Sequence, residues 1–387
     1  MTVSIEDNMK IGILTFNFAQ NYGAALQCYA LSKILINLGA DVSVMDYEPK
    51  YQRTGNAVFN NPLEVLKHEI PSNEKVVVFL KSIILNARIP GKVLKKCRFY
   101  EFRKEYINET ALLKTQEDVL MAANDFDCII VGSDQIWCKY LTGGSVDYVY
   151  FLKNVKCKKY TYAASAGSKF ESADVQNAIV LLKDFVEVSL RENTLLSQLI
   201  DEGIDNVRLD LDPTLLLCGN EWSKLANRSK LKWTRKFILF YSLEKSDDVC
   251  EAARKMQEYT GMMIIDISPI NCLSNSGLTV KKSKWISPID FLWYIQNASY
   301  VVTNSFHGNV FALLFGKPLV SVLNMSSPER VLSLFNLLGI EQYLYRDNEE
   351  LRDCIYYGCK SADEIITSYR NNSLSYLKKI VDGGEDK

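Results

Sequence analysis

The chain has 387 residues, which is too long for one small hydrophobic core and fits two domains of ordinary size. Apolar residues make up 48% and charged residues 24%, a globular composition, and 45 basic residues against 46 acidic ones leave a formal net charge of −1. Proteins that bind duplex nucleic acid usually carry a basic excess or stripe, so the charge balance argues against nucleic acid as a partner.

The first half of the chain alternates strand patterns with helix patterns. Residues 11–16, IGILTF, predict a short buried strand, and a helix with apolar residues at i, i+4 spacing begins near residue 24 and stops at Gly39. Further strands are predicted within the segments 41–47, 127–134, 159–167, 186–193 and 206–217. Strands that alternate with helices and end in polar or glycine turns are typical of an open, mostly parallel sheet.

The pattern restarts after a charged, tryptophan-bearing connector at residues 219–236. A strand, a helix and a second strand are predicted at residues 237–243, 247–259 and 262–268. Ser287 as N-cap, Pro288 at the first helical position and Asp290 at the third then predict the start of another helix.

The two runs predict an α/β protein made of two doubly wound Rossmann-like domains that face a cleft, an arrangement like the GT-B fold. The expected N-terminal domain covers residues 10–218 and the expected C-terminal domain residues 237–387, with residues 219–236 as the connector. In such sheets ligands bind beyond the carboxyl ends of the strands, so we expect functional residues in the turns that follow them.

One of only two histidines lies in TNSFHGNVFALLFGKPLV, residues 303–320. The segment predicts the end of a strand, a short apolar helix closed by Gly316, and another strand, with His307 in the turn before the helix. A helix N-terminus favours a bound anion, and Gly308 would let a ligand approach the backbone closely. A half-buried histidine that caps its own helix would fit the same pattern, so the pattern alone leaves both interpretations open.

This segment resembles the signature of the polysaccharide pyruvyl transferase family, which usually reads T-D-S-F-H-G followed by a short helix and K-P. Other stretches are similar to family motifs in the same order: ILTFNFAQNYGAALQCYAL (13–31), VGSDQIW (131–137), YAASAGS (162–168), SLREN (189–193) and LDPTLLL (211–217). The resemblance extends from about residue 10 to residue 340. Asn304 departs from it, because the family commonly has aspartate before the serine.

The resemblance implies an enzyme that transfers the enolpyruvyl carbons of phosphoenolpyruvate to two hydroxyls of a saccharide, giving a cyclic pyruvate ketal and phosphate in cell-surface polysaccharide biosynthesis. It implies no cofactor beyond phosphoenolpyruvate as donor substrate. His307 is the candidate catalytic residue, since an imidazole with a pKa near ~6.5 can donate and accept protons at neutral pH. Compared with the aspartate that is common in the family, Asn304 lacks a negative charge, so it cannot serve a mechanism that needs a carboxylate at this position.

Several arginine, serine and glycine positions are candidates for binding the donor. Arg191 resembles the donor-binding arginine of the family, because a guanidinium fork suits phosphate or carboxylate; a surface ion pair with Glu192 or Glu187 is the alternative. Three further candidates for donor binding are Ser305, Gly308 and Arg330. For Arg330, the alternative is a solvated side chain at the start of a helix.

The candidates for substrate binding are Asn21, Gly23, Ser133, Asp134 and Asn304. Asp134 could bind sugar hydroxyls, act as a base or have a buried structural role. Asp210 and Asp212 form a D-x-D pair, but Pro213 follows directly, as in the D-P turn of the family, so we predict no metal site.

Two other functions remain open on the sequence. The same fold could serve a glycosyltransferase that uses a sugar nucleotide, although NFAQNYG (17–23) has a single glycine and lacks the dinucleotide pattern G-x-G-x-x-G. The second alternative is a saccharide-binding protein without catalytic activity, and Asn304 is the only residue that supports it.

Ten scattered cysteines without a C-x-x-C pair, and no signal peptide, predict reduced thiols in a cytoplasm. Residues 1–9 are expected to form a disordered leader. Residues 75–104 combine an apolar run with a basic segment, and such a face can lie on an anionic membrane surface at the inner side of the membrane. Peripheral contact of this kind would suit a lipid-linked acceptor, and an ordinary solvated helix is the alternative.

Overall fold

The structure is a computed structural model that describes residues 8–51, 89–273, 276–346 and 349–383. A four-stranded parallel sheet of order β2-β1-β3-β4 organises the first half. Its strands are β1 (Lys10–Leu14), β2 (Asp41–Val44), β3 (Cys128–Val131) and β4 (Lys158–Thr161). A parallel pair, β5 (Val188–Leu190) and β6 (Val207–Leu209), continues beside β4 through isolated bridges.

A six-stranded parallel sheet of order β12-β11-β10-β7-β8-β9 organises the second half. Its strands are β7 (Phe237–Tyr241), β8 (Met263–Asp266), β9 (Val280–Lys282), β10 (Tyr300–Thr303), β11 (Leu319–Val322) and β12 (Leu344–Tyr345). The strands expected from the sequence are therefore present in both halves, and each is shorter than the segment that predicted it.

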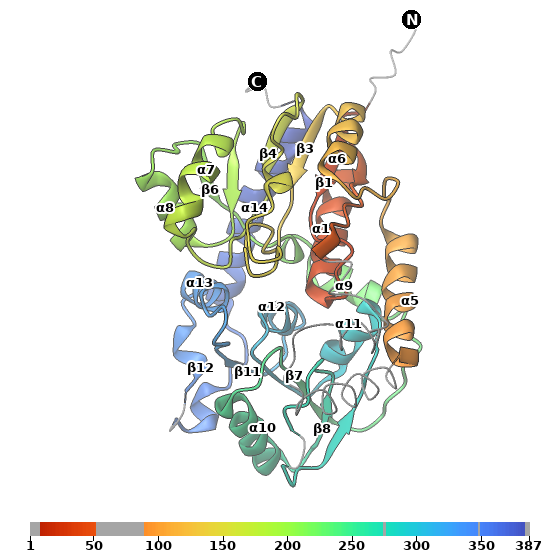
Figure 1. The fold of residues 1–387 in the computed structure, drawn as a ribbon. Coiled ribbons are helices and arrows are strands. Elements are labelled where there is room, and N and C mark those ends of the chain that lie inside the picture. Colours follow the sequence, from red (N-terminus) through yellow and green to blue (C-terminus); the bar gives the residue numbers. More distant parts are fainter. Residues whose placement is uncertain (1–7, 52–88, 274–275, 347–348, 384–387) are drawn as a thin grey trace, which may run out of the picture.

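Helices connect the strands and cover the sheets (Figure 1). Those of the first half are α1 (Tyr22–Asn37), α5 (Ile89–Tyr106), α6 (Gln116–Ala122), α7 (Ser172–Leu182), α8 (Asn193–Asp201) and α9 (Gly219–Ala226). Those of the second half are α10 (Asp247–Thr260), α11 (Pro288–Asn297), α12 (Phe306–Leu314), α13 (Glu329–Leu338) and α14 (Lys360–Val381). Short 3-10 turns are η1 (Ala123–Asp125), η2 (Tyr148–Phe151), η3 (Pro213–Leu215), η4 (Glu341–Tyr343) and η5 (Leu351–Cys354).

The predicted start of α11 is confirmed. The Ser287 hydroxyl accepts a hydrogen bond from the Asp290 backbone N–H at 3.0 Å, and the Asp290 carboxylate accepts one from the Ser287 N–H at 3.1 Å. This reciprocal pair satisfies two backbone donors at the helix start, and Pro288 occupies a position where its missing N–H costs nothing.

The last helix, α14, returns to the first half of the molecule, where Figure 1 shows it behind β3 and β4. The Tyr376 hydroxyl donates to the Thr161 carbonyl at 3.0 Å, and the buried Ser373 hydroxyl donates to Asp210 at 2.8 Å. The last helix of the predicted C-terminal domain, residues 237–387, thus has hydrogen-bond partners in the first half of the chain, and the domain bounds stay a prediction. Buried polar groups on α14 have their hydrogen-bond partners in the first half, and hydrophobic periodicity cannot reveal such partners.

We expect Ser373→Ala to lower the free energy of unfolding by about 1–3 kcal/mol, because it leaves a buried carboxylate short of one hydrogen-bond donor. Urea unfolding monitored by circular dichroism would measure the change. Ser375→Ala, on the exposed face of the same helix, is the matched control and should change stability by less than about 0.5 kcal/mol. Equal effects of the two substitutions would contradict this account of how α14 is attached.

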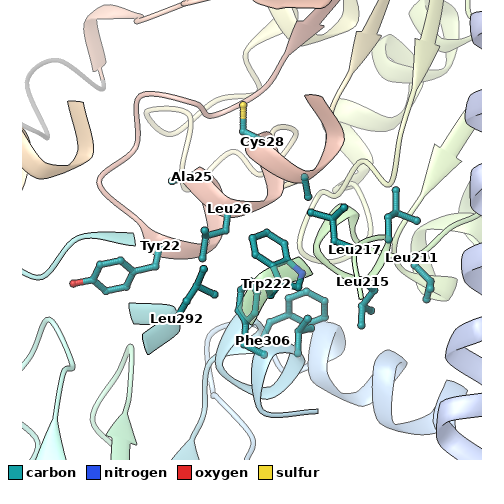
Figure 2. Close-up of a cluster of buried hydrophobic side chains, with 14 of the residues drawn as sticks. Tyr22, Ala25, Leu26, Cys28, Leu211, Leu215, Leu217, Trp222, Leu292 and Phe306 are labelled. Carbon is teal, nitrogen blue, oxygen red and sulfur yellow. The ribbon is translucent and has the colours of Figure 1, made fainter. Parts of the chain in front are cut away.

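A continuous apolar cluster joins the two halves (Figure 2). Tyr22, in the first turn of α1, stacks on Phe291 of α11 with ring centroids 4.8 Å apart. Trp222 of α9 meets Phe311 of α12 edge-on at 5.0 Å, and its indole N–H donates to the Thr214 carbonyl at 3.0 Å. Since these side chains are almost fully buried, the facing ends of α1 and α12 are held in fixed relation, which matters for the cavity between them.

The segment considered for membrane contact, residues 75–104, is described only from residue 89 onward, as the first part of α5. Phe99 and Phe102 of this helix are buried in the core, while Val93, Leu94 and Tyr100 are exposed. Among the described residues, no helix combines the length and the apolar character needed to cross a membrane. The expected leader lies outside the described residues, apart from Asn8 and Met9.

Candidate active site

A cavity of about 630 Å³ lies between the halves, at the carboxyl ends of both sheets. Its walls come from the loops after β1 and β3 on one side and from the loops after β7, β10 and β11 on the other. Five of the residues predicted for the site line it: Asn21, Asp134, Ser305, His307 and Arg330. The other five, Gly23, Ser133, Arg191, Asn304 and Gly308, are not among the lining residues, and Arg191 lies beside Arg330 on the Phe306 ring.

His307 is the second residue of α12, so it lies within the helix and not in the turn before it. Ser305 is the N-cap, with its hydroxyl accepting from the Gly308 N–H at 3.4 Å, so the histidine does not cap its own helix. Because β10 ends at Thr303 and α12 starts directly after the cap, the imidazole is carried to the cavity wall by rigid elements. Its side chain is only 8% exposed.

Gly308 packs closely against the end of β10. A Cβ atom at this position would lie 2.4 Å from the Thr303 hydroxyl, so the glycine is required by packing between α12 and β10. Its N–H is already bonded to Ser305. Gly308 therefore has a packing role, and its part in donor binding stays a prediction.

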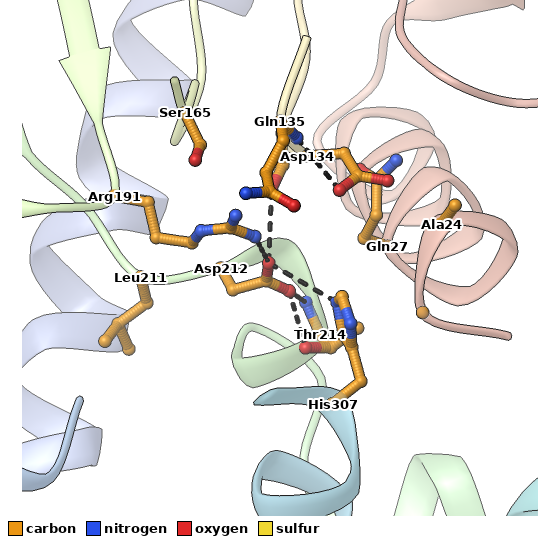
Figure 3. A network of polar contacts seen from close by, with 12 residues as sticks. Ala24, Gln27, Asp134, Gln135, Ser165, Arg191, Leu211, Asp212, Thr214 and His307 are labelled. Carbon is orange, nitrogen blue, oxygen red and sulfur yellow. Dashed lines mark hydrogen bonds and ion pairs between the residues drawn. The ribbon is translucent and has the colours of Figure 1, made fainter. Parts of the chain in front are cut away.

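Asp212 is the centre of a buried polar network that joins segments of both halves (Figure 3). One of its oxygens, Oδ2, accepts hydrogen bonds from Arg191 Nη1 at 2.7 Å and from the Ser133 hydroxyl at 3.1 Å. The same oxygen lies 3.6 Å from His307 Nε2, within ion-pair range. The other oxygen accepts from the N–H and hydroxyl of Thr214, which fixes the carboxylate in the D-P turn.

This network keeps Asp212 ionised. Burial acts to raise the pKa of its carboxyl, but the positive charges of His307 and Arg191, together with the hydrogen bonds of Thr214, outweigh burial and hold the pKa well below its usual value. A negative charge therefore faces Nε2 of His307, and it orients the ring and complements an imidazolium. A charged imidazole is the form that can donate a proton.

Arg191 is buried and does not form the surface ion pair considered as its alternative. Besides Asp212, it bonds Glu192 through Nε at 3.3 Å, and Glu192 in turn accepts from the Ser165 hydroxyl at 2.6 Å. Burial acts to lower the pKa of Arg191, but Glu192 and Asp212 outweigh it and raise the pKa. The remaining nitrogen, Nη2, has no hydrogen-bond partner among the described residues.

Arg330 is also buried, so it is not the solvated arginine considered as its alternative. It donates from Nη2 to the Ser327 hydroxyl at 3.0 Å, and its Nε has no partner among the described residues. Burial, and then the positive charge of Arg191, lower its pKa. The two guanidinium groups lie 4.9 and 5.9 Å from the centre of the Phe306 ring, so this ring supports both cations at one end of the cavity.

Two of the predicted substrate-binding residues have structural roles as well as a place near the cavity. The Asn21 side chain caps α1 by accepting from the Gly23 N–H at 2.9 Å. Asp134 has a positive φ of 88°, a conformation that side-chain-bearing residues rarely adopt. Such strain is often kept at functional sites, where surrounding structure holds a side chain in place.

Asn304 lies behind the cavity wall, fully buried. Its carbonyl oxygen accepts from the Leu243 N–H at 2.9 Å and its amide donates to the Glu244 carbonyl at 3.1 Å. An ionised aspartate could not make the second bond. Asn304 thus fastens the loop after β7, and no catalytic carboxylate stands at this position.

Sequence reasoning missed three residues of this site. Asp212 was interpreted only as part of a D-P turn, and Glu192 only as a surface partner of Arg191. Glu244, whose side chain lines the cavity, was not singled out at all. The signal for Asp212 and Glu192 was present, because buried arginines need carboxylates and both residues lie within family motifs; nothing in the sequence around Glu244 marks it.

Gly23 contacts His307 across the two halves. A Cβ atom on Gly23 would lie 1.9 Å from His307 Nδ1, so alanine would force the imidazole out of place. We expect Gly23→Ala to lower activity by at least about 100-fold, since small displacements of a reacting group can cost that much. The effect would be measured as kcat/KM once a substrate pair is in hand, and as displacement of the His307 imidazole NMR signals at any stage.

The double variant Gly23→Ala/His307→Ala tests whether the conflict is with the imidazole. With the ring removed, the methyl group added at position 23 should no longer lower the melting temperature relative to His307→Ala alone, because alanine suits a helix better than glycine does. An undiminished loss of stability in the double variant would place the steric conflict elsewhere.

A family model described as polysaccharide pyruvyl transferase matches residues 21–327. No curated protein matches the chain. Among solved structures, the chain is similar to a putative UDP-N-acetylglucosamine 2-epimerase from Listeria monocytogenes, at 12% identity and a TM-score of 0.53 with 96% of each chain covered.

A second similar structure is the UDP-GlcNAc 2-epimerase from Methanocaldococcus jannaschii, at 12% identity and a TM-score of 0.47, covering 95% of this chain and 100% of that one. At such identities structural similarity shows the fold alone. The fold is GT-B, as the sequence predicted, with two parallel sheets whose carboxyl ends face one cavity. Since the family model spans most of the chain, from residue 21 to residue 327, the chain belongs to the polysaccharide pyruvyl transferase family.

Proposed function

We propose that this protein transfers the pyruvate unit of phosphoenolpyruvate to two hydroxyls of a saccharide, forming a cyclic ketal. The observation that carries the proposal is the combination at one end of the cavity: a histidine paired with a buried carboxylate, beside two buried guanidinium groups with unused donors. Phosphoenolpyruvate carries a phosphate and a carboxylate on one small carbon skeleton, and these are the groups that guanidinium binds best.

His307 supplies the first proton. Its Nε2 faces Asp212, so Nδ1 is the nitrogen left to donate toward the methylene carbon of the donor. Protonation there turns the methylene into a methyl group and leaves the neighbouring carbon with oxocarbenium character. A positioned general acid of this kind contributes ~10²–10⁴ in rate.

Two additions then complete the ketal. The first sugar hydroxyl attacks the electron-poor carbon and loses its proton, and cleavage of the carbon–oxygen bond to phosphate regenerates an oxocarbenium-like centre. The second hydroxyl attacks and loses its proton in turn. Of the two protons lost, one replaces the proton given to the methyl group and the other leaves with phosphate, so His307, neutral after the first step, can act as base for one of them.

The acceptor side of the cavity is chemically different from the donor side. Tyr140 offers an exposed aromatic face on which a pyranose ring can stack, and the carboxylates of Asp134 and Glu244 can accept hydrogen bonds from sugar hydroxyls. Asp134 is a second candidate for the base, because it lines the same cavity as His307. We propose that the acceptor is a saccharide. If the saccharide is linked to a lipid, the exposed face of α5 could contact the membrane that holds the lipid.

Thermal unfolding with phosphoenolpyruvate, with UDP-GlcNAc or without ligand tests the choice of donor. A ligand that binds the native state raises the melting temperature, by an amount equivalent to about 2.7 kcal/mol at 100 times the Kd. We expect a shift with phosphoenolpyruvate that is lost in Arg191→Gln. A shift with UDP-GlcNAc alone would instead favour a glycosyltransferase on the same fold.

A further inference from the structure

We propose that the acceptor is an oligosaccharide of at least two units, and that its second unit stacks on Tyr140 at the mouth of the cavity, where Glu171 holds the aromatic ring in place. The inference rests on the proposed function, because it defines the acceptor of the proposed transfer more narrowly. The first unit lies at the buried end of the cavity, where its hydroxyls meet the donor, and the second unit lies at the exposed end.

The two ends of the cavity differ in how far their residues are exposed. The side chain of His307, the proposed proton donor, is only 8% exposed, and Arg330 beside it is buried. Tyr140 also lines the cavity but is 77% exposed, and its neighbour Leu141 is 47% exposed. A sugar whose hydroxyls reach His307 therefore occupies the buried end and leaves the aromatic face of Tyr140 to the next unit of the saccharide.

The Tyr140 ring is held in place although it is exposed. Its hydroxyl donates a hydrogen bond to Glu171 Oε1 at 3.1 Å, and the other oxygen of Glu171 forms an ion pair with Lys139. The Lys139 ammonium also lies over the Tyr140 ring, 5.2 Å from its centre. Because these contacts restrain the ring at its hydroxyl and at one face, little conformational freedom is lost when a ligand packs on the other face.

The backbone that carries Tyr140 is a compact turn. The Thr142 N–H donates to the Cys138 carbonyl at 3.1 Å, and the Gly144 N–H donates to the Lys139 carbonyl at 2.9 Å. Gly144 has a φ of 93°, a conformation that glycine adopts without strain. The turn therefore presents the aromatic ring at the cavity mouth in one position before a ligand binds.

A sugar suits this ring better than an apolar group does. A pyranose has C–H groups on its face that pack on an aromatic ring, and hydroxyls around its edge that form hydrogen bonds. The charged groups of Glu171 and Lys139 lie next to the Tyr140 ring and can form hydrogen bonds with such hydroxyls. An alkyl chain in the same place would displace water from both charged groups and offer no hydrogen bond in return.

Steady-state transfer to acceptors of two lengths tests the inference. Methyl glycosides of glucose, galactose and mannose are compared with disaccharides built from the same sugars. In the preferred series, kcat/KM should be about tenfold higher for the disaccharide, the gain expected from one stacked ring. Tyr140→Ala should remove most of this preference by raising KM rather than by lowering kcat. Tyr357→Ala, at an exposed tyrosine that lines a different cavity, is the matched control and should keep the preference.

Glu171 is a positioning residue, so its effect should depend on Tyr140. We expect Glu171→Ala to raise the KM of the disaccharide about threefold, and Tyr140→Phe, which keeps the ring but removes its hydroxyl, to do the same. The double variant should be no worse than either single variant, because both changes remove the same hydrogen bond. Fully additive effects would contradict the positioning role.

Binding of the same acceptors without donor, measured by saturation-transfer NMR, separates this inference from the proposed function. Tyr140-dependent binding of a disaccharide by a protein that transfers no pyruvate would support the subsite and refute the proposed reaction. Equal kcat/KM for both acceptor lengths, or a disaccharide preference that survives Tyr140→Ala, would overturn the inference and leave the proposed reaction in place. An octyl glycoside of one sugar that is used better than the disaccharide would also overturn it, because the mouth would then bind an apolar group.

Discussion

Replacement of His307 by glutamine should reduce pyruvyl transfer by about 10²–10⁴-fold while leaving the fold intact, because glutamine can fill the space and form hydrogen bonds but cannot carry the transferred proton. The Kd of phosphoenolpyruvate should change only a fewfold, since two guanidinium groups remain to bind it. Phosphate release under saturating donor and acceptor, together with donor titration, would separate the loss of chemistry from the loss of binding.

Rescue by an external base checks the interpretation. In His307→Ala the imidazole is replaced by a small void at the cavity wall, and added imidazole should restore part of the rate with a pH dependence set by the added base. A variant that retains wild-type kcat, or one that loses donor binding in parallel with activity, would refute the role of His307 as proton donor.

Replacement of Asp212 by asparagine should have a large effect on both stability and activity. The carboxylate is fully buried and contacts Arg191 and His307, so its neutralisation leaves a buried guanidinium with Glu192 as its remaining carboxylate partner. Breaking a buried pair in this way costs about 3–5 kcal/mol, to be measured by urea unfolding. Activity should fall at least about 100-fold, because the imidazolium of His307 loses its counter-charge.

Glu187→Gln is the control for Asp212→Asn. Glu187 pairs with Arg208 at 3.3 Å, but both side chains are 26% exposed, so solvent screens the pair. Exposed pairs contribute about 0–1 kcal/mol, and activity should be unchanged. Similar losses of stability in the two variants would contradict the central position of Asp212.

The pH dependence of stability should also differ between the wild type and Asp212→Asn. The folded-state pKa of Asp212 lies well below its unfolded value near ~3.9, so its contribution to stability is complete above that value and is lost as the pH falls toward the folded pKa. The stability advantage of the wild type over Asp212→Asn should therefore shrink as the pH is lowered from about 5 to about 3. An advantage that stays constant over this range would mean that the carboxyl titrates normally.

Periodicity and turn signals predicted the elements of this fold because each obeys a local rule. The capping box at Ser287 and Asp290 is an example: residue types alone satisfy the helix start, and the structure has the same bonds. The attachment of α14 to the first sheet could not be predicted in this way. It depends on pairs such as Ser373 with Asp210, which are 163 positions apart and follow no periodic pattern.

The site shows the same division. His307 could be placed at the carboxyl end of a strand, where the sheet topology brings it to the cavity. Two other roles could not be predicted from the sequence. Gly308 packs against Thr303, and Asp212, which the sequence places in a turn, is the carboxylate that contacts both Arg191 and His307. Such roles depend on which side chains are buried together, and that is settled only when both halves are packed.

The most direct test is transfer from 2-¹³C-labelled phosphoenolpyruvate in D₂O to a panel of simple hexopyranosides, followed by ¹³C NMR. We expect the labelled enol carbon to become a quaternary ketal carbon whose methyl group carries one deuterium, with release of phosphate, and no product from His307→Gln. No labelled ketal across the panel, together with consumption of UDP-GlcNAc by the same protein, would contradict the account and favour a glycosyltransferase.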